Sequence, residues 1–200
     1  MSVELSVPGP AGAVDGRRKR SEASRLKIVE AMIALVREGH TLPSAEAVAA
    51  RAGVGLRTVF RLFEDMDGVY RGMQAALAEE IGALLEAPIV APDWRAALDI
   101  LIGRRARAYE AMLPLQIAAD GQRHRSRALQ EGRARLVRNQ RDMLLPILPP
   151  AVVADPVRLD ALDLTLSFDA WRRLRMDQGA DVDGARAILR HMALTLIGEG

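Results

Sequence analysis

Two arginines, four residues apart, are the residues of this sequence best suited to bind a ligand. Arg57 and Arg61 follow the glycine-containing break in the segment RAGVGLRTVFRLF, residues 51–63. Side chains four residues apart lie on one face of a helix, so the two guanidinium groups would project together. A guanidinium group forms paired hydrogen bonds with guanine in the major groove or with a phosphate. The spacing indicates contact with a polyanion if a helix beginning near Gly55 exposes this face.

The charge distribution favours the same chemistry. The whole chain carries a net charge of only +2. Residues 17–61 contain ten Lys or Arg and four Glu, a net charge of +6, whereas residues 62–200 contain 18 Arg and 20 acidic residues, a net charge of −2. A basic segment beside a near-neutral body is typical of proteins with a polyanionic partner. Residues 1–20 are rich in Pro and Gly and end in GRRKR, which predicts a disordered basic arm.

The composition predicts an all-α protein. Helix-forming residues dominate, aromatic residues make up 4% of the chain, and hydrophobic residues make up 50%. Cysteine is absent, which fits a reducing compartment. No apolar run is long enough to span a membrane and the N-terminus has no signal-peptide pattern, so we expect a cytoplasmic protein.

A helix, a turn containing glycine and a second helix succeed one another between residues 44 and 62. Ser44 is a plausible N-cap of the first helix, and GVG at 53–55 separates it from a helix over about 56–62. This order predicts a helix-turn-helix motif whose second helix enters the major groove. From the spacing alone, a packing hairpin with solvated arginines is an equally good interpretation.

The segment SAEAVAARAGVGLRTVFRLFEDMDGVY resembles the DNA-binding segment of TetR-type transcriptional regulators. The matching positions are Val48, Ala49, Ala52, Gly53, Val54, Thr58, Phe63 and the helix restart around Val69. LSFDAWRRLRMDQGADVDGARAILRHM is similar to the C-terminal helices of many members. The resemblance implies a three-helix helix-turn-helix domain over 21–70 and a larger helical ligand-binding and dimerisation domain over 71–200. It also implies a ligand-responsive regulator, expected to be a repressor, that binds a palindromic operator as a dimer and is released by a small molecule.

The resemblance and the basic segment together give a set of expected DNA-contacting residues. They are Arg17, Arg18, Lys19, Arg20, Ser44, Gly55, Leu56, Arg57, Thr58, Phe60 and Arg61. The chain departs from the family at four positions, because the family usually has Ser or Thr at Gly55, Tyr at Phe60, His or Tyr at Leu62 and Lys at Met66. Those polar groups typically touch phosphates, so the basic arm and the two arginines are expected to compensate.

Two C-terminal helices are expected to form a homodimer interface, at 157–177 and 183–198. The first is apolar on two sides, with Val157, Leu164, Phe168 and Trp171 on one stripe and Leu159, Leu162, Leu166 and Ala170 on the other. One stripe can serve the core of the protomer and the other a second copy. The alternative is a helix buried at the centre of its own domain.

The resemblance implies a small-molecule pocket between about residues 94 and 177, where we expect helices over 94–112 and 114–120. Its candidate lining residues are Trp94, Tyr109, Met112, Gln116, Phe168 and Trp171. Each of these is also a good core residue. The arginine-rich segment 122–141 is most simply a solvated helix face, and recognition of an anionic effector is the alternative.

Catalytic and metal-binding motifs are missing from the sequence. The three histidines are dispersed, and no nucleophile elbow, phosphate-binding loop or dinucleotide fingerprint occurs. We therefore expect no enzyme activity, cofactor or metal. The rival hypothesis is a dimeric helical sensor or adaptor that does not bind DNA, suggested by the missing phosphate-contact residues.

Overall fold

The computed structural model describes residues 11–41 and 43–198, and every regular element in these ranges is helical. The all-α prediction is confirmed. The helices are α1 (Ala11–Arg37), α2 (Ala45–Ala52), α3 (Leu56–Phe63), α4 (Met66–Glu86), α5 (Trp94–Asp120), α6 (Arg127–Leu144), α7 (Pro150–Val153), α8 (Pro156–Thr165), α9 (Phe168–Arg172) and α10 (Val182–Ile197). Short 3-10 turns follow at Arg123–Arg125 and Leu145–Ile147, and a π-helical segment, Arg173–Asp177, continues α9.

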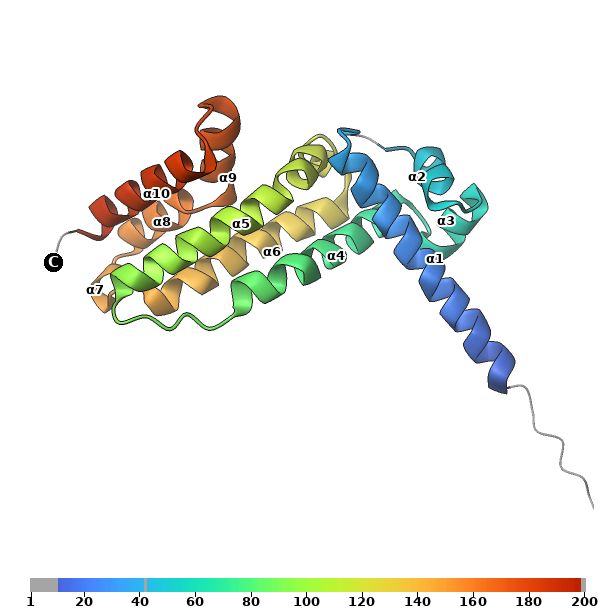
Figure 1. Cartoon of the computed structure of the whole chain (residues 1–200), viewed down its shortest axis with the longest axis horizontal. Helices are drawn as coiled ribbons and strands as arrows, with labels where there is room; N and C mark the ends of the chain where they lie inside the picture. Colours follow the sequence, from blue (N-terminus) through green and yellow to red (C-terminus); the bar gives the residue numbers. More distant parts are fainter. Residues whose placement is uncertain (1–10, 42, 199–200) are drawn as a thin grey trace, which may run out of the picture.

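The molecule is elongated, with the small N-terminal helices at one end and the C-terminal helices at the other (Figure 1). Helices α4, α5 and α6 run side by side through the middle, and α8 and α10 pack together against α5 and α6. The N-terminal part of α1 projects beyond the body (Figure 1). One continuous apolar core joins α1–α3 to the helices behind them. The expected domain boundary at residues 70–71 falls inside α4, so the two regions share this helix.

Short polar side chains begin most of the helices. A Ser or Asp side chain at the N-cap accepts a backbone N–H in seven of them, where it satisfies one of the unpaired donors of the first turn. These N-caps are Ser44, Asp65, Asp93, Ser126, Asp155, Ser167 and Asp181. Helix α3 differs, because its N-cap is Gly55 and no side chain bonds its first turn.

The expectation of a disordered arm over 1–20 is wrong for residues 11–20, which form the first turns of α1. Residues 1–10 lie outside the described residues. Residues 11–20, AGAVDGRRKR, contain no proline, and the four residues at 17–20 are Arg and Lys, which have high helix propensity. The helix can therefore continue N-terminally from the turns that pack on the core, and its projecting turns carry the GRRKR residues.

Helix α5 is also longer than expected, because it runs from Trp94 through Pro114 to Asp120 without the break predicted after residue 112. Proline inside a helix costs about 3 kcal/mol. Met112 and Leu115, on either side of the proline, are 2% and 1% exposed. Burial of this apolar face on both sides of Pro114 offsets the missing hydrogen bond.

The single two-sided helix expected at 157–177 is broken. Helix α8 ends at Thr165, and Ser167 caps α9 by accepting the N–H of Ala170 at 3.2 Å. The break changes the direction of the apolar stripes. Phe168 and Trp171 are 1% and 0% exposed, so they belong to the core of the protomer rather than to an outer stripe.

The other part of the predicted outer stripe does face solvent. Val157 and Leu164, both on α8, are 79% and 68% exposed. Ile188 and Met192 of the neighbouring α10 are 38% and 43% exposed. Exposed apolar side chains therefore lie on both α8 and α10, two helices that pack together, and the buried Phe168 and Trp171 are not among them.

Candidate nucleic-acid interface

The connection between α2 and α3 is a tight turn that depends on one glycine. Ser44 begins α2 by accepting the N–H of Ala47 at 3.2 Å. Gly53 ends the helix in the left-handed conformation, with φ of 66°, and the next N–H, of Val54, bonds the carbonyl of Ala49 at 3.0 Å. This arrangement satisfies the last carbonyls of α2 and turns the chain sharply toward α3.

Helix α3 is held by its apolar inner face. Val59 is fully buried and Phe63 is 7% exposed, as is expected for the core side of a helix-turn-helix motif. The guanidinium carbon of Arg25 lies 4.9 Å from the centre of the Phe63 ring, a cation–π contact between α1 and α3. At the start of α4, a Cβ on Gly68 would lie 2.1 Å from the Phe63 carbonyl oxygen, so glycine allows this close corner.

The outer face of α3 carries two rows of exposed side chains. Arg57 and Arg61 form a basic row, and Leu56 and Phe60 form an apolar row about 100° around the helix. Within the described residues neither arginine has a carboxylate within ion-pair distance. Thr58 is half-buried at the edge of this face. The arrangement is open to a ligand, because nothing lies within 4 Å of a Cβ placed on Gly55.

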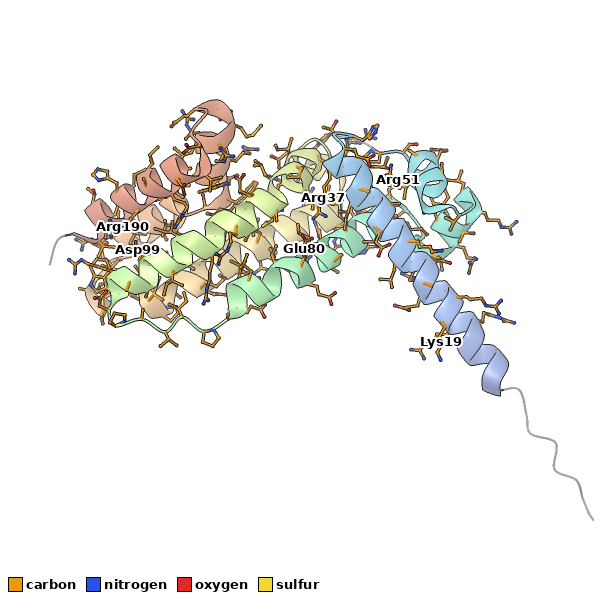
Figure 2. All side chains as sticks on the ribbon, viewed as in Figure 1. Lys19, Arg37, Arg51, Glu80, Asp99 and Arg190 are labelled. Carbon is orange, nitrogen blue, oxygen red and sulfur yellow. The ribbon has the colours of Figure 1, made fainter. Side chains whose placement is uncertain are left out.

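The projecting part of α1 brings further positive charge to the same side. A shallow hollow between α1 and α3 is lined by Arg17, Arg18, Arg20, Ser21, Glu22, Ser24 and Arg61. The basic arm and the second helix of the motif therefore meet in one place. Figure 2 shows Lys19 on the same projecting turns.

Two other arginines of the basic segment have structural roles (Figure 2). Arg37 donates to both carboxylate oxygens of Glu80, at 3.0 and 2.9 Å, and so ties α1 to α4. Arg51 pairs with Glu38 and ties α2 to the end of α1, and its hydrogen bond lowers the pKa of the Glu38 carboxyl. Their charges are neutralised locally, which leaves the hollow and α3 as the basic surface.

The positions that depart from the resembled family divide into two kinds. Gly55 and Phe60 are exposed. Leu62 is 5% exposed and Met66 is half-buried, so these two side chains pack inward. Ser44 is exposed and its hydroxyl oxygen caps α2, which leaves the hydroxyl hydrogen available for donation.

The six residues expected to line a ligand pocket are not all brought together. Tyr109 contacts Phe168 edge-to-face with ring centres 5.6 Å apart, and it lies 6.2 Å from Trp171. Met112 is buried one turn further along α5, with half-buried Gln116 beyond it. Trp94 lies 15 residues before Tyr109 on α5, about 22 Å along the helix axis, and stacks with Arg95. Trp94 is therefore separate from the aromatic cluster.

Hydrogen bonds hold two members of this aromatic cluster, Trp171 and Tyr109, in place. The Trp171 indole N–H donates to Glu110 at 2.8 Å, and Arg175 donates to the two oxygens of the same carboxylate at 2.9 and 3.0 Å. The hydrogen bond from Arg175 lowers the pKa of the Glu110 carboxyl. Burial raises the pKa of Tyr109 to about 12, so its hydroxyl stays protonated and donates to the Leu166 carbonyl at 2.9 Å.

Arg105 lies at the centre of this domain, and sequence reasoning misses it. It is 2% exposed and donates to the carbonyls of Leu166, at 3.0 Å, and Gln140. The guanidinium group thus joins α5 to α6 and to the break after α8. The sequence does hold a signal, because position 105 continues the apolar spacing of Leu98, Leu101 and Ile102 along α5.

The arginine-rich segment is largely paired within the fold. Arg133 pairs with Asp169, Arg123 with Asp120, and Arg141 with Asp160 at 2.6 Å. Arg127 pairs with Glu131 at 2.8 Å along α6 itself. These contacts favour the simpler interpretation, in which the arginines form a solvated face that holds α6 to its neighbours.

One contact links the N-terminal motif directly to the larger domain. The carboxylate of Asp67, in the first turn of α4, accepts the N–H of Ala128 at 3.3 Å, at the start of α6. Ser126, 2% exposed, caps the same helix by accepting the N–H of Leu129 at 3.1 Å. The N-terminus of α6 is therefore held by its own cap and by the helix that follows α3.

The fold is shared with a known regulator. A crystal structure of a transcriptional regulator from Rhodococcus sp. Rha1 superposes with a TM-score of 0.62, covering 86% of this chain and 93% of that chain at 18% sequence identity. No family model and no curated protein sequence matches the chain. None of the described helices is long and apolar enough to cross a membrane.

Proposed function

We propose that this chain is a TetR-type transcriptional regulator that binds a palindromic DNA operator as a dimer and is released by a small molecule. The observation that carries the proposal is the exposed outer face of α3 beside the basic turns of α1, where Arg57 and Arg61 have no carboxylate partner among the residues that the structure describes. The likeness to a transcriptional regulator of known structure supports it through the fold. The resemblance of residues 44–70 to TetR-type regulators adds the specific mode of binding.

Each part of the interface has its own role. The N-terminal half of α3 is short and open, so it can enter the major groove, where Arg57 and Arg61 can each bond a guanine. Arg17, Arg18 and Arg20 lie on a helix beside this one, where they can follow the phosphate backbone next to the groove. Base contacts would then give specificity, and the α1 contacts would give affinity.

The exposed apolar face on α8 and α10 is proposed as the dimer interface. Its four most exposed large residues, Val157, Leu164, Ile188 and Met192, lie on two adjacent helices. A second copy related by a two-fold axis would pair this face with itself in a four-helix arrangement. Dimerisation would place two α3 helices for half-sites about one DNA turn, roughly 34 Å, apart.

The effector is proposed to act in the larger domain, around the cluster of Tyr109, Phe168 and Trp171. In this structure these side chains pack on one another. A ligand that separates α5 from α9 would also disturb Arg105 and Tyr109, which both bond the Leu166 carbonyl. Such a change would favour a state with a different spacing of the two α3 helices.

The experiment that tests the proposal compares specific and random DNA. A binding sequence is first selected from a random duplex pool with the full-length protein. Arg57→Ala and Arg61→Ala are expected to weaken binding to the selected duplex far more than to a scrambled one, since a good base contact discriminates by about 1–3 kcal/mol. Alanine at both Arg17 and Arg18 should weaken both duplexes and reduce the log–log salt slope by roughly 0.9 for each phosphate that is no longer neutralised.

Arg107→Ala is the matched control, because Arg107 is exposed on α5 at a distance from the motif. It should leave both affinities unchanged. If no duplex is enriched by the wild-type protein, or if the α3 variants bind the selected duplex as wild type does, DNA reading by α3 is refuted. A dimer that binds no DNA would favour the sensor or adaptor hypothesis.

A further inference from the structure

We propose that Leu56 and Phe60 read the 5-methyl groups of thymines in the operator. This inference rests on the proposed function and adds the base identity that the apolar row of α3 would recognise. Leu56 is 37% exposed and Phe60 is 42% exposed on an eight-residue helix whose inner face is already supplied by Val59, Leu62 and Phe63. The two outer side chains are therefore not needed to hold α3 in place.

The neighbouring charges identify the partner of this apolar row. Arg57 and Arg61 form the row beside it on the same helix, and Arg17, Arg18 and Arg20 line the hollow that Arg61 shares. A surface with this charge attracts a polyanion, and an apolar protein partner would have to bury the unpaired arginines. Duplex DNA satisfies the arginines and also offers one apolar group in its major groove, the thymine methyl.

The side chain of Phe60 favours contact with a thymine methyl over contact with the DNA backbone. Its ring has no hydroxyl, and Leu56 likewise has no donor, so neither side chain can hydrogen-bond a phosphate. Where the resembled family usually has a tyrosine suited to a phosphate contact, this chain has a side chain suited to an apolar one. The substitution changes the expected role of position 60 from positioning to base recognition.

The helix geometry also predicts the spacing of the thymines. Leu56 and Phe60 are one turn apart on one face of α3, roughly 5–6 Å. Successive bases of a strand are about 3.4 Å apart along the DNA axis. The two side chains therefore reach thymines one or two base steps apart, next to a guanine bound by Arg57 or Arg61.

The test replaces each thymine of the selected operator, in turn, with deoxyuridine. This base keeps every hydrogen-bonding group of thymine and lacks only the methyl. Loss of one buried methyl should weaken binding about four-fold, and symmetric replacement in both half-sites should weaken it about fifteen-fold. The effect should occur at one or two positions in each half-site and nowhere else.

Variants of the protein assign the methyl contacts to side chains. The loss of affinity caused by a thymine-to-uracil replacement is called the uracil penalty. Double-mutant cycles combine each protein variant with each replaced base. Phe60→Ala should abolish the uracil penalty at one position, and Leu56→Ala should abolish it at the other. Arg61→Ala is the control, because it should weaken the operator and leave both uracil penalties intact. Binding to the all-thymine operator should fall in each of the three variants.

The outcomes separate this inference from the proposed function. If the selected operator is bound specifically but no uracil substitution changes the affinity, thymine reading is wrong and the regulator proposal stands. A uracil penalty that persists unchanged in both alanine variants also overturns the inference, because another group must then contact the methyl. If no duplex is selected, the proposed function fails first.

Discussion

Helix α3 begins at a residue that has the conformation of a serine N-cap without the side chain. Gly55 has φ and ψ of −73° and 147°, close to −76° and 162° at Ser44, whose hydroxyl caps α2. A Cβ at Gly55 would meet nothing within 4 Å. Gly55→Ser should therefore fit without strain. Its hydroxyl should be a second acceptor for the N–H of Thr58, which already donates to the carbonyl of residue 55 at 2.8 Å, in the way that the Ser44 hydroxyl accepts the N–H of Ala47.

Gly55→Ser is expected to raise both the free energy of unfolding and the affinity for the operator. At an N-cap, serine is better than glycine by a few tenths of a kcal/mol and better than alanine by about 1 kcal/mol. For a chain of this size, about 1 kcal/mol moves the Tm by roughly 2–4 °C. The serine hydrogen stays available for a phosphate, and a hydrogen bond to a charged group, worth about 1.5–3 kcal/mol, would tighten operator binding roughly 13- to 160-fold. The salt slope should not change, because no cation is added.

The assay compares wild type, Gly55→Ser and Gly55→Ala by thermal denaturation and by fluorescence anisotropy on the selected operator across a salt series. The alanine variant has the same Cβ and no hydroxyl, so it isolates the hydrogen bonds. Serine should give the highest Tm and the tightest binding, and alanine the lowest Tm. Equal Tm and equal affinity for the serine and alanine variants would refute the N-cap argument and place the start of α3 away from the DNA backbone.

Other parts of the fold give equally direct tests. Leu164→Asp, on the exposed face of α8, should convert the dimer to a folded monomer in light scattering with unchanged circular dichroism, and wild type running as a monomer would contradict the interface. Gly68→Ala should lower stability by about 1–3 kcal/mol through its backbone clash, whereas Gly103→Ala, with its nearest atom at 3.6 Å inside α5, should raise stability. The hydrogen bond from Arg175 lowers the pKa of Glu110 below its ordinary value, so the ionised carboxylate stabilises the fold at neutral pH. This stabilisation disappears as the pH falls through the lowered pKa. Glu110→Gln should therefore lower the Tm at pH 7, and the Tm values of variant and wild type should converge in strong acid.

Local rules in the sequence are enough to predict the helix-turn-helix geometry. Glycine between two short helices favours a turn position with positive φ, and Gly53 has a φ of 66°. The apolar spacing predicts a core of Val48, Val54, Val59 and Phe63; Val54 is half-buried and the other three are buried. Each of these expectations depends on one turn of chain and its apolar spacing, which the sequence displays directly.

The sequence misleads where tertiary packing decides between two acceptable local structures. Pro114 predicts a helix end, but burial on both sides of it keeps α5 continuous. Ser167 has the chemistry of an N-cap, yet the apolar spacing across it suggests one long helix. The buried position of Arg105 conflicts with the usual exposure of arginine, and it is explained by the two carbonyls that the guanidinium group bonds and by the nearby carboxylate of Asp163.

The first turns of α4 explain how the two ends of the molecule can act together. On one side, Gly68 and Gly72 let α4 pack closely against Phe63 at the end of α3. On the other side, Asp67 bonds the first turn of α6, and Arg135 of α6 donates to Gln74 at 3.2 Å. A shift of α6 would therefore be passed through α4 to α3 as a rigid displacement, because packed helices move as units rather than deform. In the proposed dimer, an effector that moved α6 against α5 would therefore change the position of Arg57 and Arg61 relative to their copies.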